Sequence, residues 1–360
     1  MAALPISKKG HPTTWGSGEL GKPRGLGVPV SVVSGALYCL SSMSMVLLNK
    51  VALSSFSFSC PNSLLLFQCL FCVAATRACH AYGAIRLEPL RWAIVRAWLP
   101  VNVIFVIMLG SSFWALASLN VAMVTVLKNL TNLFTLAGDY ALYGRTYGPA
   151  VLWSMALMAL SALCGGLTDL TFSARGYFWQ MVNCAAAAGY SLAMRGTMDR
   201  VAPLTASGAR MDELSMVFYN NLLSLPLVLL LAAGNGELGR LAAEPDLRDA
   251  RFLVVAALSA AIGFAISFTS LWFIASATPT IYSLVGSLNK VPIAVVGLVA
   301  FHTPWTPANL ASIAVGLGAG AVFGLAKSAP PPKAIQVKVA ATDLSEEDVQ
   351  LVARLEDDKP

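Results

Sequence analysis

Long hydrophobic runs separated by short polar stretches fill the chain from residue 28 to residue 327. A helix needs about 20 predominantly apolar residues to cross a bilayer. Ten segments approach that length, and each is predicted to be a membrane-spanning helix. They cover residues 28–50, 60–80, 98–118, 121–143, 148–168, 174–196, 213–233, 251–275, 278–301 and 305–327.

Composition agrees with an all-α polytopic membrane protein. The 360 residues are 57% hydrophobic and 12% charged, whereas soluble domains contain about 25% charged residues. The two ends differ in kind. Residues 1–27 lack apolar periodicity and are predicted to be disordered, and residues 328–360 form a polar tail that begins with prolines. No cleavable signal peptide is visible, so the first span is expected to act as a signal anchor.

The basic residues give the orientation. Most of the 24 Lys and Arg residues fall on segments that share a side with both termini. Cytosolic loops of membrane proteins are rich in Lys and Arg, so both termini are predicted to be cytosolic. The net charge of +6 therefore reflects orientation and does not indicate nucleic-acid binding.

An internal repeat relates the two halves of the chain. Residues 112–166 align without a gap on residues 270–324, and Trp114 matches Trp272 while Pro149 matches Pro307. The repeat superposes the fourth and fifth spans on the ninth and tenth, and a shift of five spans inverts the topology. The sequence therefore predicts ten helices in two inverted repeats, residues 28–168 and 174–327, as in alternating-access transporters.

Lysines lie deep within two of the predicted spans. A charge at the centre of a membrane helix costs about 2.5–3.5 kcal/mol, so such residues indicate function. Each half supplies a lysine and an asparagine, Lys128-Asn129 and Asn289-Lys290, at similar depth. Two lysines facing one cavity suit an organic diphosphate. Snorkelling is the alternative for both lysines. A packing role is a further alternative for Lys290, and a bond to Asp139 is a further alternative for Lys128.

Two polar strings have the character of a ligand site. Tyr282, Gly286 and Lys290 are four residues apart and are predicted to share one helix face, where Gly286 lets a ligand approach the backbone. Asn220 and Asn221 offer adjacent carboxamides that match the mixed donors and acceptors of guanine. Hydrogen bonding between helices is the alternative for the asparagine pair.

Enzyme chemistry has no support in the sequence. The seven cysteines lie mostly within spans and no cysteine or histidine pattern suits a metal. Paired carboxylates for acid–base catalysis are not found in the spans. We therefore expect neither an enzyme nor a cofactor.

The string Phe218-Tyr219-Asn220-Asn221, followed by Gly286-Ser287-Leu288-Asn289-Lys290, resembles the signature pair of the nucleotide-sugar transporters that carry GDP-mannose in the Golgi. These proteins belong to the drug/metabolite transporter superfamily, and the similarity extends over residues 28–327. The resemblance implies a Golgi membrane antiporter that exchanges GDP-sugar for GMP. It implies no cofactor and no nucleic-acid partner, with membrane lipid as the surroundings and a homodimer left open.

The resemblance also assigns roles to residues. Guanine is assigned to Asn220, Asn221 and Ser267. Ribose and phosphates are assigned to Lys290, Tyr282, Asn289 and Lys128. The sugar is assigned to Tyr38, Gly286 and Ser287. Some members have tyrosine at the position of Val124, and Ser287 replaces a frequent alanine, so the identity of the sugar stays open.

Two other functions remain as alternatives. A phosphate/organic-anion translocator of the same superfamily, as in a plastid envelope, is the first, although the asparagine pair argues against it. A membrane scaffold without transport is the second, although a scaffold has no need of lysines at the midplane of both halves.

Overall fold

The structure is a computed structural model that describes residues 30–328 apart from positions 57, 145 and 278. The two predicted tails lie outside the described residues. Every regular element in the described part is helical. The elements in chain order are α1 (Val30–Ser54), α2 (Pro61–Ala81), α3 (Trp92–Ser118), α4 (Val121–Leu127), α5 (Leu130–Tyr143), α6 (Pro149–Leu167), α7 (Ala174–Val201), η1 (Ala202–Leu204), α8 (Glu213–Gly234), α9 (Glu237–Leu241), η2 (Pro245–Arg248), α10 (Ala250–Ser276), α11 (Pro279–Leu288), α12 (Lys290–Ala300) and α13 (Pro307–Ser328).

Helix ends follow local sequence signals. Proline occupies the first position of α2, α6, α11 and α13, where its missing N–H is not needed. Asn120 caps α4 by accepting a hydrogen bond from the Met123 backbone N–H at 2.8 Å, and Asp212 caps α8 in the same way through Ser215. The Asn120 cap separates the third and fourth predicted spans, which hydropathy alone nearly fuses.

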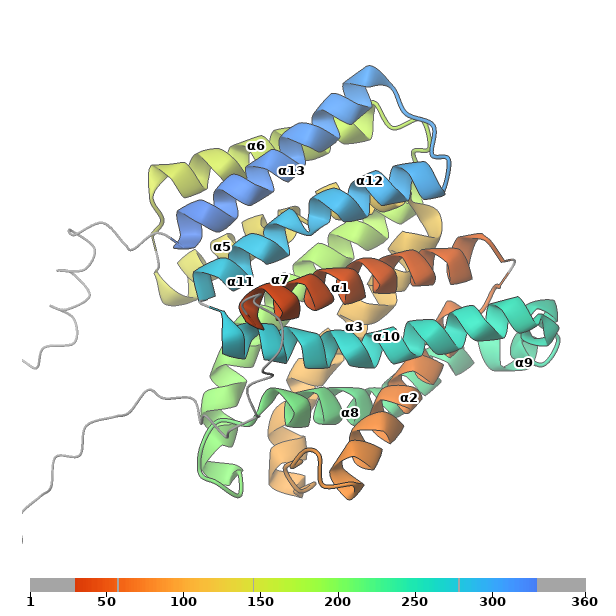
Figure 1. Cartoon of the computed structure of the whole chain (residues 1–360), viewed down its shortest axis with the longest axis vertical. Helices are drawn as coiled ribbons and strands as arrows, with labels where there is room; N and C mark the ends of the chain where they lie inside the picture. Colours follow the sequence, from red (N-terminus) through yellow and green to blue (C-terminus); the bar gives the residue numbers. More distant parts are fainter. Residues whose placement is uncertain (1–29, 57, 145, 278, 329–360) are drawn as a thin grey trace, which may run out of the picture.

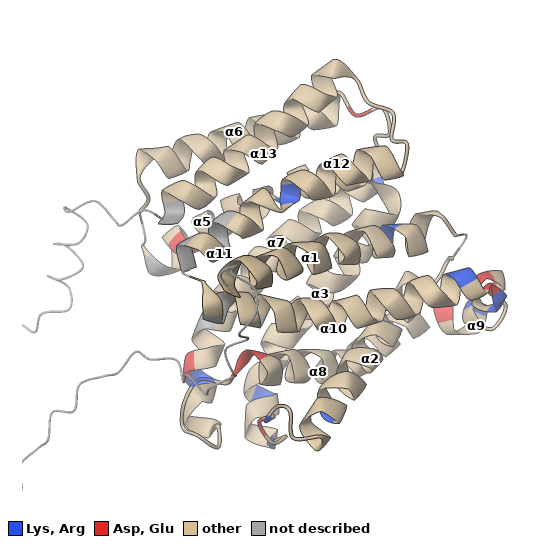
Figure 2. Cartoon of the chain, in the orientation of Figure 1, with Lys and Arg blue, Asp and Glu red and all other residues tan. Residues whose placement is uncertain are grey.

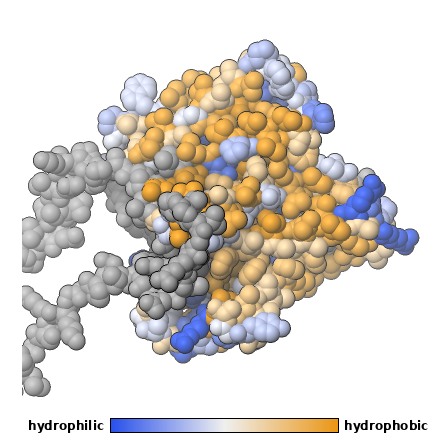
Figure 3. Space-filling view, viewed as in Figure 1, coloured by the Kyte–Doolittle hydropathy of each residue, from blue (hydrophilic) through white to orange (hydrophobic). Residues whose placement is uncertain are grey.

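Length and composition mark a polytopic membrane protein. Among the described residues, eight helical segments are long and apolar enough to cross a membrane, and Val285–Ala300 is a shorter apolar one. Charged residues gather near the ends of the helices (Figure 2). The face between those ends is predominantly hydrophobic (Figure 3). The prediction of an all-α polytopic membrane protein is therefore confirmed.

The helices pack in pairs drawn from distant parts of the chain. α1 lies against α10 and α6 lies against α13 (Figure 1). α3 packs on α7, α2 on α8, and α4 on α12. Small residues permit close approach between some partners: a Cβ on Gly297 of α12 would lie 2.6 Å from Cβ of Val121 on α4.

Two predicted spans are broken in the middle, where continuous helices were expected. The segment 121–143 divides into α4 and α5 at Lys128-Asn129, and 278–301 divides into α11 and α12 at Asn289. Pro292 accounts for the second break, because it has no N–H to bond the carbonyl of Leu288 four residues earlier. At the first break the N–H of Asn129 bonds Val126 three residues back, a local 3₁₀ turn.

At one end of the molecule, two carboxylates from the connection between α8 and α10 bind the start of α2 and a residue shortly before it. Glu237 is fully buried and accepts hydrogen bonds from the backbone N–H and side chains of Asn62 and Ser63 at the start of α2. Glu244 accepts from the backbone N–H of Ser59 at 3.0 Å and from its hydroxyl. Carboxylates are stabilised at helix N-termini, so these contacts hold two distant segments together.

Candidate functional site

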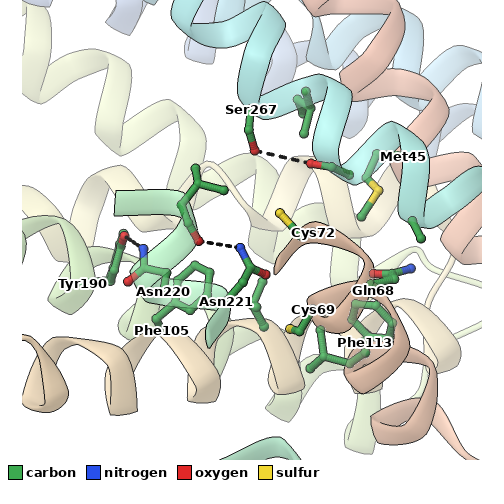
Figure 4. A pocket seen from close by; sticks show the side chains of 16 residues that line it. Met45, Gln68, Cys69, Cys72, Phe105, Phe113, Tyr190, Asn220, Asn221 and Ser267 are labelled. Carbon is green, nitrogen blue, oxygen red and sulfur yellow. Dashed lines mark hydrogen bonds between the residues drawn. The ribbon is translucent and has the colours of Figure 1, made fainter. Parts of the chain in front are cut away.

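A cavity of about 340 Å³ opens between α1, α2, α3, α7, α8 and α10 (Figure 4). Its walls are mostly apolar, with a few polar side chains that converge on it, which is the usual character of a small-molecule site. Asn220, Asn221 and Ser267, the three residues expected to recognise guanine, all line it. The structure therefore brings this predicted group together from two helices.

The two asparagines differ in how much of their amide is free. Asn220 is buried, accepts a hydrogen bond from Trp98 Nε1 at 2.8 Å, and donates Nδ2 to Tyr190 Oη at 2.7 Å. Asn221 donates Nδ2 to the Val217 carbonyl of its own helix at 2.8 Å. Its Oδ1 and second N–H have no hydrogen-bond partner in the described part of the chain, and so they remain for a ligand. Asn221 is thus the freer of the two, whereas much of Asn220 is used to hold Tyr190.

Gln68 of α2 lines the same cavity and was missed from the sequence. Its Nε2 donates to Asn49 Oδ1 at 2.8 Å and to Ser259 Oγ at 2.9 Å. A single glutamine within an apolar run resembles a packing residue, and only the tertiary contacts place it opposite Asn221. Tyr190 was missed for the same reason.

The deep lysines lie close to each other in a separate group. Lys290 Nζ donates to Asn129 Oδ1 at 2.6 Å, and Lys128 is near enough to repel the Lys290 ammonium group. The ammonium group of Lys128 makes no hydrogen bond to any described residue. Oδ1 of Asn289 is buried and has no partner among the described residues. The predicted phosphate group therefore has an unused cation and an unused amide oxygen.

The sugar group is only partly described. A Cβ on Gly286 would lie 3.8 Å from Tyr38 Oη, so these two predicted residues lie side by side. Ser287 is half-buried. The side chain of Tyr282 lies outside the described residues. Gly286 and Lys290 lie on either side of the break at Asn289, so their predicted common helix face crosses that break. Asn289 itself retains a helical φ of −58°.

A third buried lysine has a structural role instead. Lys50 donates to the carbonyl oxygens of Leu116 and Leu119 at 2.8 and 2.6 Å. These carbonyls belong to the C-terminal end of α3, where the helix dipole favours a cation. Burial of a lysine within a span therefore does not by itself mark the ligand site. Lys128 differs because no described carbonyl or amide receives its hydrogen bonds.

Comparison with known proteins supplies the family. A model of the Triose-phosphate Transporter family matches residues 29–324. The chain belongs to that family. Among its relatives is the GDP-mannose transporter GONST2 of Arabidopsis thaliana, 47% identical over 82% of this chain and 79% of the relative. GONST1 of the same plant, also named a GDP-mannose transporter, is 47% identical over 82% of this chain and 89% of the relative.

A more distant relative carries the same name. The GDP-mannose transporter of Scheffersomyces stipitis is 33% identical over 83% of this chain and 92% of its own length. The resemblance inferred from the two motifs is therefore confirmed. Membership of the Triose-phosphate Transporter family also identifies the chain as a transporter and not an enzyme.

Proposed function

We propose that this protein imports GDP-mannose, or a closely related GDP-sugar, into the Golgi lumen in exchange for GMP. The observation that carries the proposal is the joint presence of 47% identity to two proteins named GDP-mannose transporters and a cavity with Asn220, Asn221 and Ser267 in its wall. The base occupies this cavity. The phosphates lie at Lys128 and Lys290.

Ten spans in two inverted repeats are part of the proposal. Helix boundaries support it, because α3 ends at Ser118 and α10 at Ser276, and α6 begins at Pro149 while α13 begins at Pro307. These pairs have the same offset as the sequence repeat. Packing supports it as well. If each helix is replaced by its counterpart in the other half, α1 becomes α7 and α10 becomes α3. The contact of α1 with α10 then corresponds to the contact of α7 with α3, and both contacts are extensive.

Alternating access follows from that arrangement. The central contacts of α4 with α12 and of α6 with α13 each join corresponding spans of the two halves. Rocking of one half against the other exposes a midplane site to each side in turn. Both helices that contribute the lysines are broken beside them, and discontinuous helices are typical of transporter binding sites.

Golgi location and cytosolic termini complete the proposal. The distribution of Lys and Arg supports the orientation, and the names of the relatives support delivery of a sugar donor to a compartment where mannose is transferred. Release of the sugar leaves a nucleotide that must return, and GMP fits the same base cavity and lysines. Counter-transport therefore needs no separate ion gradient.

The test is uptake by proteoliposomes that contain the purified protein and are loaded with GMP. External GDP-mannose should enter quickly, whereas UDP- and CMP-sugars should enter slowly, and empty vesicles should show little uptake. Triose phosphate and inorganic phosphate form a further arm, because the family takes its name from such substrates. Faster exchange of those anions than of GDP-sugars would contradict the proposal, and absence of all exchange would favour a scaffold.

A further inference from the structure

Hydrogen bonds fix the orientation of the Gln68 amide. The Ser259 hydroxyl donates its hydrogen to the carbonyl of Ala256 at 2.8 Å, so its oxygen can only accept from Gln68. Asn49 Oδ1 is also an acceptor. Both hydrogens of Gln68 Nε2 are thereby used, and the amide cannot turn over without placing its oxygen against the Ser259 oxygen, whose hydrogen is already donated to Ala256.

The remaining atom of this amide is an acceptor beside the cavity. Oε1 of Gln68 receives no hydrogen bond from any described residue. Figure 4 shows the oxygen of Gln68 on the side that faces Asn221, and the nitrogen on the far side. A polar atom with no partner in an apolar wall costs free energy unless a ligand supplies a donor. The ligand is therefore expected to place a donor here.

Asn221 presents a different pattern on the opposite wall. One N–H of its amide is used by Val217, which leaves one N–H and Oδ1 for a ligand. A carboxamide with one free donor and one free acceptor matches the N1–H and O6 edge of guanine as a two-point contact. The exocyclic amine at C2 lies next to N1, and its hydrogens then need a further acceptor.

We propose that Gln68 Oε1 accepts a hydrogen bond from this exocyclic amine, so that Gln68 is a specificity-determining residue for guanine. The inference rests on the proposed function, since it assumes that a guanine nucleotide occupies the cavity. It adds a residue from the opposite half of the chain to the base site. It predicts selection against hypoxanthine, a purine that shares N1–H and O6 with guanine but lacks the amine.

Competition in proteoliposomes tests the proposal without any substitution. Uptake of labelled GMP is measured against increasing unlabelled GMP or IMP, which differ only by the amine. Wild type should prefer GMP by about 5- to 150-fold, the range expected when a buried acceptor loses its partner. If wild type prefers GMP to UMP and CMP but treats GMP and IMP alike, the proposed function stands and the role of Gln68 is wrong.

Variants then assign the preference to one side chain. Gln68→Met keeps the length of the side chain and removes the acceptor, so GMP should weaken while IMP changes little, and their ratio should approach one. Gln68→Glu retains an acceptor toward the ligand but places its second oxygen against Asn49 and Ser259, so it should weaken GMP and IMP together while it retains a clear preference for GMP. Cys72→Ala, one turn along the same helix and in the same cavity wall, is the matched control and should change both affinities together.

The ratio separates recognition from a structural role. Damage to the network of Asn49 and Ser259 would weaken GMP and IMP alike and leave their ratio unchanged. A Gln68→Met protein that retains the wild-type ratio, or a Gln68→Glu protein that loses it, would overturn the proposal. If Gln68→Met does not fold, the wild-type comparison and Gln68→Glu still decide the matter.

Discussion

Replacement of Lys128 by methionine should stabilise the empty protein and abolish its response to nucleotide. The Lys128 ammonium has no hydrogen-bond partner among the described residues, and the neighbouring Lys290 repels it. Methionine has a similar length and no charge. The substitution therefore removes an unfavourable charge without breaking a hydrogen bond.

The magnitude follows from the cost of a charge within the membrane. That cost is about 2.5–3.5 kcal/mol at the centre of a helix on insertion scales. Lys128 is half-buried, so we expect only part of that cost to apply. We expect the free energy of unfolding to rise by about 1–3 kcal/mol in the Lys128→Met protein. Relief of the repulsion from Lys290 acts in the same direction.

Lys50→Met is the matched control because its effect on the free energy of unfolding should have the opposite sign. Lys50 is also a buried lysine in a span, but it donates to two carbonyl oxygens of α3. Hydrogen bonds to a charged group contribute about 1.5–3 kcal/mol each. Loss of both hydrogen bonds costs more free energy than removal of the buried charge recovers. The Lys50→Met protein should therefore be less stable than wild type by about 1–2 kcal/mol.

Thermal unfolding in detergent, with and without GMP, measures both effects. A ligand at 100 times its Kd stabilises the folded state by about 2.7 kcal/mol. Wild type and Lys50→Met should show that increase, whereas Lys128→Met should show a high midpoint that GMP does not raise. A Lys128→Met protein that unfolds earlier than wild type, or that still responds to GMP, would refute the assignment of Lys128 to the phosphates.

Three further predictions follow. Asn221→Ala should lower affinity for GDP-sugar by about 1–3 kcal/mol, roughly five- to 150-fold in a competition assay, because base groups lose their partners; unchanged affinity would exclude Asn221 from the base site. Gly297→Ala should force a methyl group against Val121 and slow exchange, with a cost of about 1–3 kcal/mol, while Gly318→Ala, which meets nothing within 4 Å, should exchange normally. Burial raises the pKa of Glu244, but hydrogen bonds from Ser59 outweigh it and hold the pKa below its ordinary value. The contribution of Glu244 to stability should therefore persist at pH 5 and fall only as the pH drops through that lowered pKa; unfolding midpoints of wild type and Glu244→Gln that already converge at pH 5 would contradict this.

The sequence was sufficient for the all-α membrane class and the family because both depend on local patterns. Hydropathy marks each apolar run, and the two short motifs are contiguous. The helix breaks were not predicted. Pro292 was visible, but whether a proline bends or interrupts a helix depends on the surrounding contacts. We have no sequence account of the break at Lys128-Asn129.

The role of a polar residue within a span could not be predicted from its position alone. Lys50 and Lys128 have similar apolar surroundings in the sequence. Lys50 meets the end of α3, which is 66 residues away in the chain, whereas Lys128 meets no described partner. Gln68 was missed for a related reason, since its fixed orientation depends on Ser259 in the other half. These distinctions arise only when distant helices pack.

The electrostatics of the empty site explain why exchange should be faster than one-way transport. Lys128 and Lys290 repel each other in an apolar setting, and a bound phosphate group offsets both charges. The lysines come from opposite halves, so a state that encloses them without an anion is disfavoured. GDP-sugar and GMP carry about two negative charges each, since a phosphate monoester has a second pKa of about 6. Either ligand therefore lowers the barrier to reorientation by a similar amount. Under the proposed exchange, the empty carrier would retain that barrier, which would couple entry of one nucleotide to exit of the other without a proton or sodium gradient.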